Sequence, residues 1–125
     1  MDGIKKAVTR EILLGFWKAH ILHHAEEGPL VGHWMLLELR RHGYDISPGT
    51  LYPLLRRMER NGWLKFVPDA GAGPRSPRKY YLTSVGRKVL RLVRSNVKEL
   101  HRELVEESAH HSVSNRRRRS GRASS

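Results

Sequence analysis

The stretch Ser47-Pro-Gly-Thr-Leu-Tyr-Pro-Leu-Leu-Arg-Arg-Met-Glu-Arg-Asn-Gly62 contains the start, the buried face and the end of one short helix. Ser47 is a favourable N-cap because its hydroxyl can accept a hydrogen bond from the first turn, and Pro48 already has the backbone angle of a first helical residue. Asn61-Gly62 predicts a left-handed end to the helix. Apolar residues at helical spacing predict one buried stripe, formed by Leu51, Leu54, Leu55 and Met58.

The opposite face of this helix is basic. At about 100° per residue, Arg56 and Arg60 point away from the stripe, with Thr50 and Arg57 on one flank and Tyr52 on the other. One interpretation is a solvated basic surface. The other is a recognition helix, whose N-terminus favours a phosphate and whose guanidinium groups can fork onto guanine edges or phosphate oxygens. We favour the recognition helix.

Composition narrows the class of protein. The 125 residues suit one domain, and the formal charge of +12 points to a polyanionic partner, most often nucleic acid. Five arginines within residues 112–125 supply +5 of this charge, so the rest of the chain is basic as well. Without cysteine there are no disulfides and no thiolate metal sites. No apolar run reaches the roughly 20 residues of a membrane span, and no signal peptide is apparent, so we expect a cytoplasmic, nucleoid-associated protein with no membrane partner.

Two more helices precede the quoted stretch. The first is predicted from about Val8 to Glu27, and the second from about Val31 to His42, where Gly43 ends it. The first helix has a predicted buried face, whereas Phe16 and Leu22 fall outside it; the face consists of Leu13, Leu14, Trp17, Ile21 and Ala25. Short links between three helices predict a tri-helical unit whose second and third members form a helix-turn-helix.

The periodicity changes after Gly62. The runs Trp63–Val67 and Lys79–Leu82 are aromatic and β-branched, and turn-forming residues separate them, which predicts a β-hairpin with a long tip. Arg75, Arg78 and Lys79 make this tip basic. The tip is either a flexible surface loop or a wing that follows the DNA backbone or enters the minor groove; we favour the wing.

A long final helix is predicted from Ser84 to Ala109, with Thr83 as its N-cap. It carries a seam of residues spaced by three or four, consisting of Val85, Val89, Leu92, Asn96, Leu100 and Leu104. Such a seam is too long for a tri-helical core, so a second copy of the chain is the expected partner in a C2 dimer, although the helix could instead fold back on its own domain. The predicted domains are a DNA-binding domain at 1–83, a dimerisation helix at 84–109 and a disordered basic tail at 110–125.

Three segments in this order closely resemble the PadR family of bacterial winged-helix transcriptional regulators. They are Gly28-Pro29-Leu30-x-Gly32, the stretch Ser47 to Gly62, and Arg78-Lys-Tyr-Tyr-Leu-Thr-x-x-Gly86, and the resemblance covers about residues 12–107. It implies the short subgroup with one C-terminal helix: an α+β fold, mainly helical with a small hairpin. It also implies a dimeric repressor that leaves a pseudo-palindromic double-stranded DNA operator when a small molecule or another signal arrives.

The resemblance also implies which residues face DNA. Together with Ser47 at the start of the third helix and Arg78 beside the wing, the candidate DNA-contacting residues are Ser47, Thr50, Tyr52, Arg56, Arg57, Arg75, Arg78, Lys79 and Tyr80. An effector could bind in a cleft between the DNA-binding bodies, for which the candidate apolar residues are Trp17, Ile21, Trp34, Val93 and Val97. Core packing accounts for these five residues equally well.

Other functions are less well supported. The chain has no Gly-rich phosphate loop, no nucleophile motif and no paired carboxylates on an apolar face, so an enzyme is not expected and no cofactor is predicted. His20 and His24 lie one turn apart, with His23 and His33 elsewhere on the first two helices, so a metal- or pH-responsive regulator is an alternative. Ordinary half-buried histidines are the favoured interpretation, with no metal site. An RNA-binding winged-helix module is a further alternative.

Overall fold

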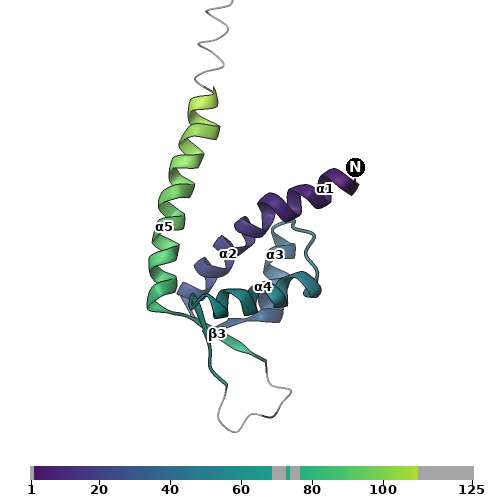
Figure 1. The fold of residues 1–125 in the computed structure, drawn as a ribbon, viewed down its shortest axis with the longest axis vertical. Helices are drawn as coiled ribbons and strands as arrows, with labels where there is room; N and C mark the ends of the chain where they lie inside the picture. The colour runs from purple at the N-terminus through teal and green to yellow at the C-terminus, as the bar shows by residue number, and fades with distance from the viewer. Residues whose placement is uncertain (1, 69–72, 74–76, 110–125) are drawn as a thin grey trace, which may run out of the picture. The chain divides into compact units, whose positions relative to one another are not determined.

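The computed structural model describes residues 2–68, 73 and 77–109. Their order along the chain is helix, short strand, two helices, hairpin and long helix (Figure 1). The elements are α1 (Asp2–Val8), the π-helical segment η1 (Thr9–Leu13), α2 (Leu14–Glu27), β1 (Leu30–Val31), α3 (Gly32–Arg41), α4 (Pro48–Arg60), β2 (Leu64–Phe66), β3 (Lys79–Leu82), α5 (Ser84–His101) and the π-helical segment η2 (Arg102–Glu107). The predicted class, mainly helical with a small antiparallel sheet, is confirmed.

The first helix is longer and more buried than predicted. Helical structure begins at Asp2 rather than near Val8 and continues through η1 into α2. Trp17, Ile21 and Ala25 are buried as predicted, but placing Leu22 outside the buried face was wrong, because it is buried too. The reason is that α2 packs against both β3 and α3, so two sides of this helix are covered.

The helix-turn-helix consists of α3 and α4. Met35, Leu36 and Leu39 of α3 are buried, and Ile46 of the connecting turn joins them. Gly43 takes a φ of +94°, a left-handed conformation that side chains rarely adopt, and the turn is closed where Arg40 Nε donates to the Ile46 carbonyl at 3.0 Å. The predicted stripe of α4 is confirmed, since all four of its apolar residues are buried.

The start of α4 differs from the prediction in one detail. Ser47 is the residue before the helix, but its hydroxyl makes no capping hydrogen bond to the first turn. Instead Ser47 Oγ lies 3.3 Å from Thr50 Oγ1, while the Ser47 carbonyl accepts from the Thr50 and Leu51 amides at 3.1 and 3.0 Å. Pro48 is the first helical residue as predicted, and Gly62, with a φ of +79°, ends the helix.

A three-stranded antiparallel sheet in the order β1-β3-β2 supports these helices. The predicted hairpin is β2 paired with β3, in which Leu64 lies opposite Leu82 and Phe66 opposite Tyr80. Strand β1 was not predicted; its Leu30 lies opposite Tyr80 and its Val31 opposite Lys79. A strand of two residues is too short to show an alternating apolar pattern in the sequence, so β1 is recognised only by its pairing with β3.

Thr83 joins the end of α4, the sheet and the start of α5. Its hydroxyl accepts a hydrogen bond from the Gly86 amide at 2.9 Å, which confirms the predicted N-cap. The same hydroxyl lies 2.6 Å from the Gly62 carbonyl and 3.1 Å from the Trp63 carbonyl, and the Thr83 amide donates to Trp63 at 3.1 Å. Gly86 and Leu90, in the first turns of α5, are buried.

The long final helix is confirmed, since helical structure continues through η2 to Ala109. One compact unit of the chain ends at Leu90 and a second begins at Arg91, so the division falls within α5. The basic tail predicted at 110–125 lies outside the described residues. None of the helices in the described part has both the length and the apolarity to cross a membrane.

Gly86 tests the junction at Thr83. A Cβ at Gly86 would overlap the Trp63 carbonyl oxygen and lie 2.6 Å from Leu82 Cδ1. We therefore expect Gly86→Ala to lower the free energy of unfolding by about 1–3 kcal/mol, measured by urea denaturation. Gly15→Ala is the matched control, because nothing lies within 4 Å of a Cβ there, and the better helix former should stabilise by about 0.5–1 kcal/mol. Equal stabilisation by both changes would contradict the packing described.

Candidate nucleic-acid interface

The outward face of α4 is a rigid basic surface. Arg56, Arg57 and Arg60 are exposed, and within the described residues none of them forms an ion pair. Because the leucine stripe on the other side is buried, α4 cannot rotate without exposing its apolar residues. The backbone therefore holds the three arginines in a fixed position facing solvent, and their long side chains can still adjust to reach an acceptor.

The first turn of α4 is suited to an anion. Ser47 is exposed and Thr50 is half-buried, so two hydroxyls lie at the helix N-terminus. There is no acidic side chain in this first turn to repel an anion. A phosphate oxygen could accept hydrogen bonds here, favoured by the positive end of the helix dipole.

Tyr52 borders a shallow hollow next to the hairpin. Its ring lies so close to Gly32 that a Cβ at Gly32 would come within 2.7 Å of Tyr52 Cε1. The hollow has a volume of about 130 Å³ and is lined by Val31, Gly32, His33, Tyr52, Pro77, Arg78 and Tyr80. Sequence reasoning found Gly32 in a motif but missed that the residue leaves space for Tyr52.

Arg78 is held at the base of the hairpin. Its guanidinium carbon lies 3.8 Å from the centre of the Phe66 ring, and Nη2 lies 3.8 Å from Glu59 Oε2 of α4. The side chain is still 54% exposed, so the stacked cation remains accessible to an external anion. Lys79, the next residue, is half-buried and pairs with Val31 in the sheet.

Two predicted wing residues have a different outcome. Tyr80 is only 2% exposed, because in β3 it alternates inward, opposite Leu30 and Phe66. It is a core residue and we remove it from the DNA-facing set; Tyr81, which alternates outward, is the exposed tyrosine of this strand. Arg75 lies outside the described residues.

The five candidate effector residues are not one site. Trp17 and Ile21 are fully buried in the core, which corrects their assignment to an open cleft. Trp34 is 47% exposed on α3, with its ring 5.2 Å edge-on from His24. Val93 and Val97 follow Leu90 and belong to the second compact unit.

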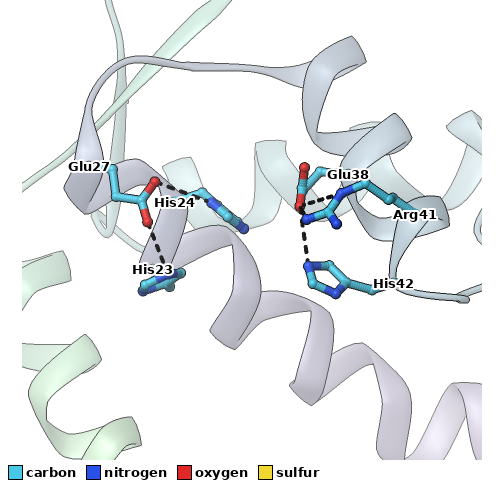
Figure 2. A network of polar contacts seen from close by, with 6 residues as sticks. All are labelled: His23, His24, Glu27, Glu38, Arg41 and His42. Carbon is cyan, nitrogen blue, oxygen red and sulfur yellow. Dashed lines mark hydrogen bonds and ion pairs between the residues drawn. The ribbon is translucent and has the colours of Figure 1, made fainter.

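Histidines gather where the end of α3 meets α2. His20 and His24 of α2 lie near His42, whose ring centre is 5.1 Å from that of His20. Burial lowers the pKa of His20, and the nearby His42, His24 and His23 lower it further, partly offset by Glu38. Figure 2 shows His23 and His24 on one helix and Glu38, Arg41 and His42 on the neighbouring element. Sequence reasoning named His20 and His24 but missed His42, which is distant in sequence.

Comparisons with known proteins agree with this geometry. The family model described as "Transcriptional regulator PadR-like family" matches residues 21–92, from the middle of α2 to α5. The chain belongs to the PadR family. A curated relative, "Transcriptional regulator Rv3488" of Mycobacterium tuberculosis, is 42% identical over 101 residues, which cover 81% of this chain and 94% of the relative.

Solved structures of PadR proteins have the same fold. A PadR family transcriptional regulator from Eggerthella lenta is 33% identical, with a TM-score of 0.67 over 84% of this chain and 92% of that one. A PadR-like transcription factor from Bacteroides fragilis is 27% identical, with a TM-score of 0.64 over 84% of this chain and 97% of that one. The fold is therefore the PadR winged helix, and the protein is a transcriptional regulator rather than an enzyme, as its family is.

The stacking of Arg78 on Phe66 gives a test of the hairpin base. We expect Arg78→Ala to lower the free energy of unfolding by about 0.5–1 kcal/mol, because the planar cation leaves the ring. Arg78→Lys keeps the charge towards Glu59 but loses the flat contact, so most of that loss should remain in chemical denaturation. A lysine variant as stable as the wild type would mean that the stacking contributes nothing.

Proposed function

We propose that this PadR regulator is a homodimer that binds a pseudo-palindromic operator in double-stranded DNA, associated with the nucleoid in the cytoplasm. It acts as a repressor and leaves the operator in response to a small molecule or another signal. The observation that carries the proposal is the basic face of α4, which is exposed while the opposite face is locked into the core. Family membership supports DNA as the partner.

In this proposal α4 enters the major groove. Arg56 and Arg57 lie two turns from the helix start, where guanidinium groups reach guanine O6 and N7 or phosphate oxygens. Ser47 and Thr50 at the helix N-terminus contact a backbone phosphate, and Tyr52 flanks the same approach. Arg78 and Lys79 lie at the base of the wing and place positive charge beside the neighbouring backbone.

The dimer is supported by the apolar surface of α5. Leu92 is 63% exposed and Leu104 is 61% exposed, and Val85, Leu100 and Asn96 of the same seam are exposed as well. Burial of each such leucine against another helix contributes about 1.5–3 kcal/mol. A second copy offers the same seam in return, as a C2 interface requires, and Asn96 could pair with its symmetry mate near the axis.

In this proposal the protein leaves the operator when the separation of its two α4 helices changes. In a symmetric dimer the two α4 helices must meet major grooves about 34 Å apart. A signal that binds the dimer and changes this separation weakens both half-sites together, because each keeps its contacts only at the correct distance. Trp34, Val93 and Val97, the exposed or half-buried members of the candidate effector set, remain the residues to test for such a signal.

Variants at Arg56 and Lys79 distinguish sequence-specific base contacts from nonspecific phosphate contacts. We expect Arg56→Ala to weaken operator binding by about 1–3 kcal/mol while affecting unrelated duplexes much less. Lys79→Ala should weaken all duplexes alike and flatten the salt dependence by about one unit, since a phosphate contact releases a counterion. Fluorescence anisotropy with operator and scrambled duplexes over a salt series measures both effects.

Lys5→Ala, on the exposed last turn of α1, is the control and should leave operator affinity unchanged. Structured RNA added as a competitor should displace the protein no better than scrambled duplex. Unchanged operator affinity in Arg56→Ala would remove Arg56 from the reading surface, and strong competition by RNA would replace DNA as the partner.

Leu100→Asp tests the dimer. A charge placed in the seam should convert a particle of twice the 14.5 kDa chain mass into a monomer, because the carboxylate cannot be buried unpaired. Lys98 lies on the opposite side of α5, so Lys98→Asp should leave the dimer intact even though it changes the net charge by more than Leu100→Asp does. Light scattering after gel filtration gives the mass, and a wild-type monomer at micromolar concentration would overturn this part of the proposal.

A further inference from the structure

Three imidazole groups from two separate elements converge on the side of the helix-turn-helix. His20 and His24 lie one turn apart on α2, and His42 is the residue immediately after α3. One ring nitrogen from each lies within 4.8 Å of the other two.

His24 has a ring nitrogen without a hydrogen-bond partner. This atom, Nδ1, is buried, and Glu27 Oε2, at 3.6 Å, is beyond hydrogen-bond distance. A buried polar nitrogen without a partner is costly, by about 1–3 kcal/mol. Trp34 packs edge-on to the same ring and helps to hold it in place.

His42 carries the carboxylate partner that metal-bound histidines commonly have. Glu38 Oε1 lies 3.2 Å from His42 Nε2, and the Glu38 side chain is 11% exposed. Arg41 Nε donates to the same carboxylate oxygen at 3.2 Å. Figure 2 shows Glu38 between Arg41 and His42.

We propose that His20, His24 and His42 form a binding site for a divalent transition-metal ion of the zinc, cobalt or nickel class. Imidazole nitrogens suit these borderline ions, whereas calcium and magnesium require oxygen ligands and the chain contains no cysteine for softer ions.

The rearrangement needed for binding is small. A tetrahedral ion with bonds of about 2.0–2.1 Å holds its ligand nitrogens about 3.3 Å apart. Since the ligand atoms lie within 4.8 Å of one another, each pair must approach by at most about 1.5 Å, which side-chain rotation of half-buried and exposed residues allows. Water would complete the coordination, while Glu38 stays paired with His42 Nε2.

A second histidine group provides a built-in comparison. His23, His24 and Glu27 also lie within 4.8 Å of one another, but the side chains of His23 and Glu27 are 49% and 59% exposed, compared with 39% for His42. Both groups need His24, so only one of them can hold an ion at a time. The His20 group is favoured because it joins two elements and has Glu38 as its carboxylate partner.

A bound ion would link α2 to the turn that leads into α4. His42 directly precedes Gly43, and Arg40 closes this turn onto Ile46 just before α4 begins. Operator affinity should therefore differ between metal-free and metal-loaded protein; this consequence alone rests on the proposed DNA binding. Metal binding itself can be measured without DNA, so the two ideas fail separately.

The experiment uses the full chain, stripped of metal with a chelator, and titrated with Co²⁺ and Zn²⁺. We expect one ion per chain, and a cobalt absorption spectrum typical of tetrahedral nitrogen ligands. His20→Gln and His42→Gln should each lower zinc affinity at least 100-fold in calorimetry, and Glu38→Gln should lower it about 10- to 100-fold. Circular dichroism melting checks that each variant is folded.

Two matched controls distinguish other sites. His23→Gln should bind zinc as the wild type does, and so should the double variant H110Q/H111Q, which removes the other adjacent pair of histidines in the chain. If His23→Gln lost binding while folded His42→Gln kept it, the ion would belong to the His23 group and the proposal would be wrong. Loss of binding in H110Q/H111Q, or absence of binding in the wild type, would overturn it as well.

Discussion

The Thr83 hydroxyl joins three parts of the fold: the end of α4, the β-hairpin and the start of α5. The Thr83 hydroxyl contacts the Gly62 and Trp63 carbonyls and caps α5 through the Gly86 amide. Gly86 in turn packs so closely on the Trp63 carbonyl that no side chain fits between them. The end of α4, the hairpin and the first turns of α5 therefore behave as one body, and none of them can shift without breaking these contacts.

This constraint explains why α4 is a suitable recognition element. Its two ends are both fixed, by the Arg40 contact to the Ile46 carbonyl before it and by Gly62 and Thr83 after it. Its inner face is buried along its whole length, so the arginines on the outer face start from a defined position. Less ordering entropy is lost when such a surface binds than when a mobile loop does, which favours affinity and a fixed register on the duplex.

The sequence predicted the features that depend on neighbouring residues and missed those that depend on distant ones. The stripe of α4, the hairpin and the length of the final helix follow from periodicity and turn residues, and all were confirmed. By contrast, β1 exists only because Leu30 meets Tyr80, fifty residues later, and the inward direction of Tyr80 depends on the same register. Leu22 was predicted to lie outside the buried face, and His42 was not named among the candidate histidines. In both cases the residue contacts an element that is not adjacent in sequence, so the local pattern gives no sign of the contact.

The division of α5 between two compact units has a consequence for the proposed dimer. Residues 84–90 belong to the body that contains α4, whereas the seam continues beyond Arg91 through Leu104. Thr83 and Gly86 fix residues 84–90 to the body that contains α4. In the proposed dimer, a signal that alters the pairing of the two α5 helices would weaken both half-sites together.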